Sequence, residues 1–543
     1  MQLTDCFKRV WRRCRRYSNY RKESRRIELE LDTNFVCDPN FLCVFMEGSD
    51  TISCLTSDED VSDAVQDCIE RLWPAGLKEV VDNVWGVQFR MQGNPLGGDQ
   101  KIFKRRLAFN TLICHLLFRL RHLGWKLELD TVLRCSDRIS TFFFTRESNM
   151  ALFTALQGLF AHCSPEDAVC ISVIGWDKLV LVNCNEPLES IVESAVRKKR
   201  IKKNMELDEN SRQLQLDSHF WNDITRADAV EGRRVILEII QYFHKNGYIF
   251  QTKLSLRSCT DNYYFLPGRP STVNSPRFFI LSLNESSRIR LIDCNIDASS
   301  TVRQCVQEHW SKGLKKYKFL REEWCSEFQL KGSPWRCTDL ENTEARTLIT
   351  IILERLQQIG WRIHCTLDVS TRLHERATFV MRTAPSTPCH FLAISPVERR
   401  VLKIVRAPEQ VQEVILELVR TCWPTDIESQ TVRVDTCEVR LTKNAQWGCI
   451  RTKCFMSRLI CKLHTFGYLL AASANLDDPF SQNREWGPHT WFFCRELSIQ
   501  KKVSLSSAVS DWWESNESSS ESDCDVPQNA PVRFKLGGRS MSL

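Results

Sequence analysis

The hydrophobic and polar positions along the chain follow one order of elements four times. The most complete copy, residues 324–379, reads WCSEFQLKGSPW, then the run TEARTLITIILERLQQ, then IGWRIHCTLDVS and ATFVM. Alternation of apolar and polar residues predicts strands, and apolar residues three and four positions apart predict helices. A glycine followed by an aromatic residue marks every copy: Gly124-Trp125, Gly247-Tyr248, Gly360-Trp361 and Gly467-Tyr468.

When each copy is extended toward the N-terminus, its order becomes strand, strand, helix, strand, helix, strand, strand. Most of the short strands are neighbours in sequence, which favours an antiparallel sheet, and we expect two helices to cover it. The fold class is therefore α+β, with four tandem repeat domains about 110 residues apart, a longer period than that of solenoid repeats. We expect each to have a small core of its own. The predicted domains are 27–150, 151–270, 271–385 and 386–500, between an N-terminal arm at 1–26 and a tail at 501–543.

The positions shared by the copies predict core packing rather than a site. In the third copy, the second helix carries its apolar residues on one stripe, at Leu348, Ile351, Ile352, Leu356 and Ile359. Gly360 follows at the C-cap position, where a left-handed backbone favours glycine. We expect Trp361 and the other marker aromatics to lie in the core.

One loop differs between the copies. The pattern Gly-x-Pro-Trp is complete only in the third copy, at residues 332–335. Because degenerate copies suggest a duplicated scaffold whose surfaces diverged, this loop is a candidate protein contact. Its residues are Lys331, Gly332, Pro334 and Trp335.

The first 26 residues form a basic arm. They hold ten Lys or Arg residues against Asp5 and Glu23, a local charge of +8, whereas the whole chain carries +7. On a helix, the arm has one apolar stripe and one cationic face, which is typical of a helix on an anionic membrane surface. The predicted contact residues are Phe7, Lys8, Arg9, Val10, Trp11, Arg12, Arg13, Arg15 and Arg16, and the candidates for lipidation are Cys6 and Cys14.

Two other interpretations of the arm stay open. Its apolar stripe could pack on the first repeat, or the arm could serve nuclear import or nucleic-acid binding. A second basic segment, RKKRIKK at 197–203, directly follows a predicted helix. It matches a simple import signal, and it also matches a solvated helix end, because helix C-termini attract cations.

The tail is rich in serine, aspartate and glutamate from about residue 505 onward. Such a composition cannot build a core, so we expect disorder there. Acidic residues follow three positions after Ser518, Ser520 and Ser522, a pattern that acidophilic kinases prefer, so these serines are predicted phosphorylation sites. Trp512 and Trp513 interrupt the polar tail as a candidate protein-docking motif.

No catalytic or cofactor signature is recognisable. The motifs G-x-x-x-x-G-K-[ST], G-x-G-x-x-G, H-E-x-x-H and G-x-S-x-G do not occur. The 25 cysteines are scattered without any C-x2-C pair, which disfavours a zinc ribbon and a disulfide framework and favours buried, reduced thiols. No apolar run approaches the ~18–20 residues of a membrane span, and the N-terminus lacks a secretory signal segment.

These features favour a non-enzymatic, cytoplasmic scaffold or adaptor that is tethered to an anionic membrane by its arm and regulated through its tail. The expected partners are other proteins and that membrane, and no cofactor, metal or small-molecule substrate is predicted. The main alternative is a nuclear protein that binds nucleic acid through residues 1–26 and 197–203, and an enzyme of unrecognised type is the third. The near-neutral charge of the repeats argues for the first interpretation, because a nucleic-acid-binding body should carry basic stripes.

Overall fold

The structure is a computed structural model that describes residues 39–497, apart from 84, 96–102, 134–138, 148–152, 155–157, 159, 161, 198–199, 218–219, 222–224, 255–261, 269–275, 336–338, 370–376, 398–399, 443–448 and 477–488. The chain divides into two units, Met1–Gln500 and Lys501–Leu543. The first unit contains all four repeats and is the one described below. None of the helices in the described ranges is long and apolar enough to cross a membrane.

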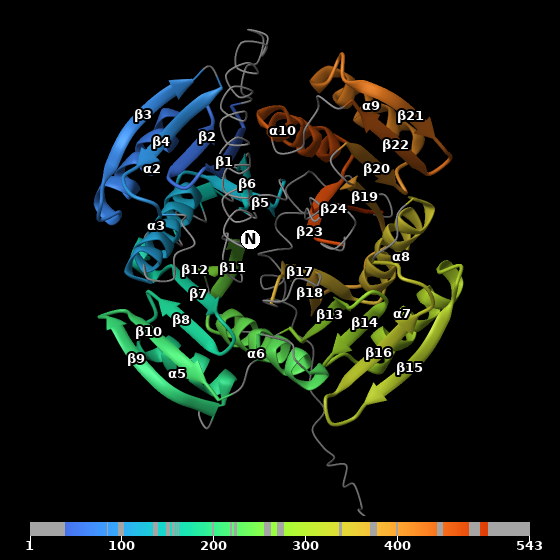
Figure 1. Ribbon diagram of the computed structural model, residues 1–543, viewed down its shortest axis with the longest axis horizontal. Helices are drawn as coiled ribbons and strands as arrows, with labels where there is room; N and C mark the ends of the chain where they lie inside the picture. The colour runs from blue at the N-terminus through green and yellow to red at the C-terminus, as the bar shows by residue number, and fades with distance from the viewer. Residues whose placement is uncertain are drawn as a thin grey trace, which may run out of the picture. The chain divides into compact units, whose positions relative to one another are not determined.

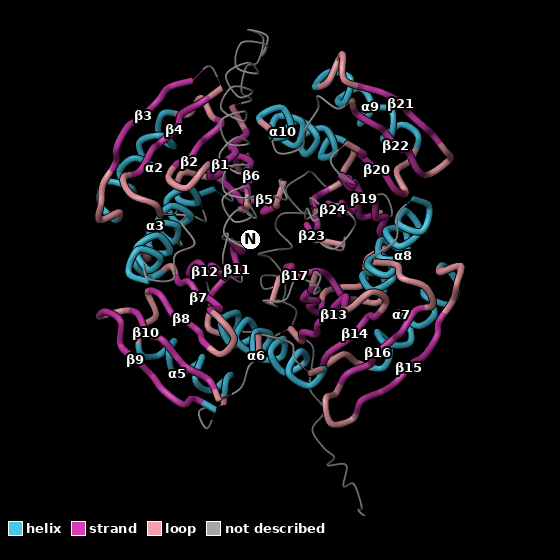
Figure 2. Tube along the Cα trace, viewed as in Figure 1, coloured by secondary structure: helices cyan, strands magenta, loops and turns pink. Residues whose placement is uncertain are grey.

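Each repeat consists of six strands and two α-helices in the order ββαββαββ (Figures 1 and 2). Repeat 1 comprises β1 (Phe41–Glu47), β2 (Thr51–Leu55), α2 (Glu59–Leu72), β3 (Leu77–Asn83), β4 (Gly86–Met91), α3 (Phe103–His122), β5 (Trp125–Thr131) and β6 (Thr141–Arg146). Repeat 2 comprises the short η2 (Pro165–Asp167), then β7 (Val169–Ile174), β8 (Lys178–Val182), α5 (Glu186–Val196), β9 (Ile201–Asp208), β10 (Ser211–Leu216), α6 (Arg226–Lys245), β11 (Tyr248–Leu254) and β12 (Asn262–Pro267).

The last two repeats follow the same plan. Repeat 3 comprises β13 (Phe278–Asn284), β14 (Arg288–Ile292), α7 (Ile296–His309), β15 (Leu314–Leu320), β16 (Cys325–Leu330), α8 (Asp339–Gln358), β17 (Trp361–Leu367) and β18 (Thr378–Thr383). Repeat 4 comprises β19 (Cys389–Val397), β20 (Val401–Val405), α9 (Glu409–Cys422), β21 (Ile427–Val432), β22 (Thr436–Leu441), α10 (Ile450–Thr465), β23 (Leu469–Ala474) and β24 (Thr490–Glu496).

The six strands of each repeat form one antiparallel sheet with a common strand order, which in repeat 3 is β15-β16-β14-β13-β18-β17. The α+β class and the four tandem repeats predicted from the sequence are thus confirmed. The predicted order lacked one element, the strand after the first helix: β3, β9, β15 or β21. These strands lie at the outer edge of each sheet, and most of their side chains are exposed on both faces. The alternation that reveals a half-buried strand is therefore missing from them.

Local signals in the sequence set where the helices begin and end. The N-cap of α7 is Asn295, whose side-chain oxygen accepts a hydrogen bond from the N–H of Ala298 at 3.1 Å. Beyond α8, Gly360 has the predicted left-handed backbone, with φ of +86°, and a Cβ there would lie 2.9 Å from the Ala384 carbonyl oxygen. Trp361 comes next and is buried, which confirms its predicted place in the core.

The second helix of a repeat packs on two sheets, not one. Helix α8 contacts β17 of its own repeat and β19 and β20 of repeat 4. Its buried residues share one apolar cluster with Phe279 of the first sheet and Phe391 of the second. Similar clusters join repeat 2 to repeat 3 and repeat 4 to repeat 1. The expectation of four separate cores is therefore wrong, because neighbouring repeats bury their apolar residues together.

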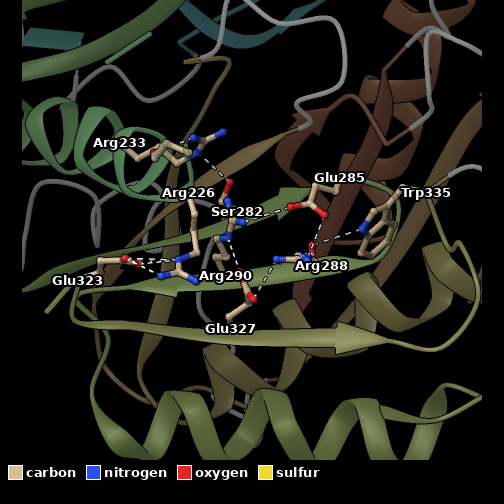
Figure 3. A network of polar contacts seen from close by, with 10 residues as sticks. Arg226, Arg233, Ser282, Glu285, Arg288, Arg290, Glu323, Glu327 and Trp335 are labelled. Carbon is tan, nitrogen blue, oxygen red and sulfur yellow. Dashed lines mark hydrogen bonds and ion pairs between the residues drawn. The ribbon is translucent and has the colours of Figure 1, made fainter. Parts of the chain in front are cut away.

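A buried polar contact recurs at these joints between repeats. At the joint between repeats 2 and 3, Arg233 of α6 donates from Nε to Ser282 Oγ of β13 at 2.9 Å (Figure 3). At the next joint, Arg346 of α8 donates from Nε to Ser395 Oγ of β19 at 2.7 Å. Both arginines are about as buried as the aliphatic core. The second helix thus fixes its position on the following sheet by a specific hydrogen bond.

The other two joints use different chemistry at the corresponding place. Asn110 of α3 donates to Ser172 Oγ of β7 at 2.9 Å. Between repeats 4 and 1, Lys453 Nζ of α10 lies 3.9 Å from the ring centre of Phe45 in β1. A cation held over an aromatic face contributes to this joint.

The two edges of each sheet have different surroundings. The inner edge strands β5, β11, β17 and β23 contact one another. Thr366 Oγ1 donates to the Ser473 carbonyl at 2.8 Å, and Trp491 Nε1 donates to Thr131 Oγ1 at 3.0 Å. The second of these bonds joins repeat 4 to repeat 1, so the contacts between repeats form a closed cycle. The outer edges β3, β9, β15 and β21 carry mostly exposed residues.

Candidate interaction surface on the third repeat

Several residues predicted as functional fall outside the described part of the chain. They are the arm residues Phe7, Lys8, Arg9, Val10, Trp11, Arg12, Arg13, Arg15 and Arg16, the cysteines Cys6 and Cys14, and the tail residues Trp512, Trp513, Ser518, Ser520 and Ser522. Their roles stay predictions.

The Gly-x-Pro-Trp loop of repeat 3 is largely built into its own domain. The side chain of Trp335 is buried, and its indole Nε1 donates to the Arg288 carbonyl at 3.3 Å. Trp310, at the end of α7, donates from Nε1 to the Lys331 carbonyl at 2.9 Å. Pro334 is also buried, so only Lys331 and Gly332 are exposed. The tryptophan therefore closes the hairpin between β13 and β14 and is not presented to a partner.

The basic segment at 197–203 leads into an edge strand. Helix α5 ends at Val196, and β9 begins at Ile201. Arg200 forms an ion pair with Glu231 at 3.0 Å, while Lys202 and Lys203 are exposed on β9. The described end of this segment thus begins strand β9, and only part of its charge is neutralised by the described residues.

The four outer edge strands differ in charge although they occupy equivalent places. Within the strand bounds, β15 has three lysines and no acidic residue, a charge of +3. The corresponding charges are −1 for β3, zero for β9 and −1 for β21. Only β15 also contains aromatic residues, Tyr317 and Phe319. Repeat 3 therefore offers a basic and aromatic sheet edge.

The two faces of β15 carry different chemistry. The register places Lys316 opposite Gln329 and Lys318 opposite Glu327 on the adjacent strand β16. Tyr317 points to the other face, where its ring lies 5.0 Å from that of Phe328 and 5.4 Å from the Arg303 guanidinium. Lys316 and Lys318 thus lie on one face of the edge, and Tyr317 and Phe319 on the other. No ion pair engages Lys315, Lys316 or Lys318 among the described residues.

The hairpin that follows β15 presents a tryptophan to solvent. Trp324 is 68% exposed and has φ of +41°, a left-handed conformation that is unfavourable for a bulky residue. Its ring packs edge-to-face on Phe319, which is 49% exposed, at a centroid distance of 6.4 Å. Strain and exposure at the same tryptophan suggest a functional position.

The preceding repeat holds this hairpin in place (Figure 3). Arg226, at the start of α6, binds both carboxylate oxygens of Glu323 at 2.9–3.0 Å, and these hydrogen bonds raise the pKa of Arg226. Arg234 pairs with Asp293 at 3.0 Å and also donates to the Glu323 carbonyl. Because a bidentate arginine–carboxylate pair fixes geometry, residue 324 is presented from a preorganised turn.

An ion-pair network on strands β14 and β16 lies on the face of the sheet that carries Lys316 and Lys318, and Figure 3 shows its arginines and carboxylates. Glu327 is buried and accepts hydrogen bonds from Arg290 Nε at 2.9 Å and Arg288 Nη1 at 3.1 Å. Burial alone would raise the pKa of Glu327, but its two arginine partners bring that pKa below the ordinary value. Both arginines also pair with Glu285, so two cations balance two carboxylates and the lysines of β15 are not needed to neutralise Glu327. The exposed residues Lys315, Lys316, Tyr317, Lys318, Phe319 and Trp324 are called the β15 surface below.

Most of the described cysteines are buried. Burial raises the pKa of Cys54 and of Cys170 to about 12, so these thiols are protonated at neutral pH. Among the described residues, no group of three or more His, Cys, Asp or Glu side chains is placed to hold a metal ion.

Comparison with known proteins identifies the repeat. A single domain-family model matches the chain four times, at residues 40–150, 167–265, 277–382 and 390–494. Comparisons with curated proteins and with solved structures give no match. Since the four matches together span most of the chain, the protein belongs to the family defined by this domain, which it carries in four tandem copies.

Proposed function

We propose that this protein is a non-enzymatic scaffold whose repeats bind partner proteins along their outer sheet edges. The observation that carries the proposal is the contrast between conserved architecture and divergent edges within one chain. All four repeats have the same strand order, yet the charges of β3, β9, β15 and β21 differ. Exposed edges are natural templates for an added strand from another chain.

The proposal includes a membrane tether at the arm. Residues 1–26 combine an apolar stripe with ten cations, and each cation near an anionic surface contributes about 1 kcal/mol. Nuclear nucleic-acid binding through residues 1–26 and 197–203 is the second candidate. Its support is the basic composition of those segments and the exposure of Lys202 and Lys203. Phosphorylation of the tail serines would add charge that regulates either role.

Site-specific photo-crosslinking in living cells tests the scaffold function. A benzophenone amino acid replaces Val80, Met205, Phe319 or Gln430, one on each outer edge, and Asp63 on helix α2 serves as the control position. We expect discrete protein adducts from edge positions, with different partners for different edges. Adducts no more frequent at the four edges than at Asp63 would contradict the proposal.

Localisation of a fluorescent fusion tests the tether. Peripheral membrane signal should be lost when residues 1–26 are deleted and reduced when Phe7 and Trp11 are replaced by serine, because only lipid insertion needs the apolar face. Nuclear signal that persists after the deletion would contradict the tether and favour the second candidate.

A further inference from the structure

We propose that the β15 surface binds an extended acidic peptide of a partner protein, which adds to the sheet as a seventh strand. This inference rests on the proposed scaffold function and names the partner chemistry at one edge. Half of the backbone N–H and C=O groups of an edge strand point away from its sheet. On β15, residues 315–319 are all exposed, so this backbone is accessible within the described structure.

The two faces of β15 define which peptide fits. An extended peptide places alternate side chains on opposite faces. Carboxylates on one side would lie beside Lys316 and Lys318, and apolar residues on the other beside Tyr317 and Phe319. Cross-strand pairs of opposite charge and of aromatic with β-branched residues are the favourable ones. The surface therefore selects a peptide in which acidic residues alternate with β-branched or aromatic residues.

The turn after β15 supplies an anchor at the end of this edge. Trp324 is largely exposed, packs against Phe319 and is held from behind through the Glu323 contacts of Arg226 and Arg234. A rigid, exposed tryptophan contributes a large apolar contact at a small entropic cost on binding. The anchor and the edge thus form one continuous binding surface on repeat 3.

The charge of the edge also disfavours pairing with a second copy of β15. Self-pairing would bring three lysines of one strand against three of another, and like charges opposite each other destabilise a strand pair. The edges of the other repeats carry no net positive charge. An acidic partner is therefore the occupant that this edge favours.

Fluorescence anisotropy with the full chain tests the proposal. The probe is a labelled heptapeptide in which glutamate alternates with valine, compared with the same peptide N-methylated at alternate amides and with a version that has lysine in place of glutamate. We expect the unmodified protein to bind only the first peptide. The affinity for that peptide should be at least tenfold lower in the variants K316E/K318E and W324S. The matched control K202E/K203E on β9 should bind like the unmodified protein.

Each alternative outcome is distinct. Equal affinity for the N-methylated peptide would exclude strand addition, and equal affinity of K316E/K318E would exclude β15 as the site. Concentration-dependent self-association of the full chain that W324S abolishes would assign the surface to a second copy instead. Crosslinked partners at Val80, Met205 or Gln430, without peptide binding at β15, would overturn this inference and leave the scaffold function intact. Melting temperatures of all variants confirm that they are folded.

Discussion

Arg346 of α8 donates a hydrogen bond from Nε to the hydroxyl of Ser395 in the following repeat, at 2.7 Å. Ser395 Oγ is in turn 2.8 Å from Thr490 Oγ1 on the neighbouring strand β24. The arginine belongs to repeat 3, and both hydroxyls belong to repeat 4. This contact helps to fix the position of repeat 4 on repeat 3, since an apolar interface alone is not directional.

Replacing Arg346 by alanine should therefore destabilise the whole chain of repeats. A hydrogen bond from a charged group contributes about 1.5–3 kcal/mol, and the lost packing adds to this. Urea unfolding at pH 7.5 measures the change, with R71A on the exposed face of α2 as the control. A midpoint for R346A equal to that of R71A would contradict the role of the joint.

Two glycines allow a matched test of backbone and packing strain. Gly313 and Gly360 both have positive φ, but a Cβ meets nothing within 4 Å at Gly313, whereas at Gly360 it lies 2.9 Å from the Ala384 carbonyl oxygen. G313A should cost about 1–2 kcal/mol, the usual cost of a left-handed alanine. G360A should cost more, because the backbone at Ala384, just after strand β18, must move. Equal unfolding free energies for both variants would show that the contact with Ala384 is not restrictive.

The sequence predicts those elements of the fold that have one buried and one exposed face. Residues such as Leu348 and Ile352 lie on a stripe that faces the core, so helices, glycine caps and half-buried strands could be located. Tyr317 and Phe319 alternate with Lys316 and Lys318, but all four are exposed, and a polar stretch between two clear elements reads as a loop. The outer strands, and with them the β15 surface, were therefore missed.

The joints were missed for a different reason. Arg233 appears in the sequence as an ordinary polar position of an amphipathic helix, and only tertiary structure buries it against Ser282. A helix whose polar side holds one deeply buried cation cannot be distinguished by periodicity from one whose cation is solvated. The Gly-x-Pro-Trp loop is the opposite case: its residues are distinctive in the sequence, but they serve packing within the domain. The exact domain boundaries, the arm and the tail stay predictions.

Buried histidines should make the protein less stable in mild acid. Burial, and then the nearby Lys253, lower the pKa of His489 well below its ordinary value, and its Nδ1 contacts Ser473 Oγ at 2.9 Å. A folded-state pKa below the unfolded one means that the unfolded chain binds the extra proton. The contribution of this histidine to the free energy of unfolding is therefore fully present above about pH 6.5. It is lost as the pH drops below that value, by up to about 1.4 kcal/mol per pH unit for one such group.

The variant H489Q can keep the contact with Ser473 but cannot titrate. Its unfolding free energy, measured between pH 7.5 and 5, should fall less steeply than that of the unmodified protein. H309Q, at a partly exposed position on α7, is the control. Identical slopes for H489Q and the unmodified protein would contradict this assignment.

The buried thiols should resist alkylation in the folded protein. Burial raises the pKa of Cys54, Cys170 and Cys184 to about 12, and the thiolate is the reactive form. Iodoacetamide at pH 8, followed by mass spectrometry of the peptides, should modify these cysteines slowly in buffer and rapidly in urea. Rapid modification in buffer would place them at an exposed or opened part of the structure.

Hydrogen–deuterium exchange of the full chain, with and without the peptide of alternating glutamate and valine, tests whether β15 is a partner-binding edge. Strand addition requires new hydrogen bonds to the outward-facing amides of β15. We predict that saturating peptide slows exchange within residues 314–320 and leaves the corresponding edge strands β9 and β21 unchanged. Unchanged exchange at 314–320 under saturation, or protection confined to residues 1–26, would contradict the claim that β15 is a partner-binding edge.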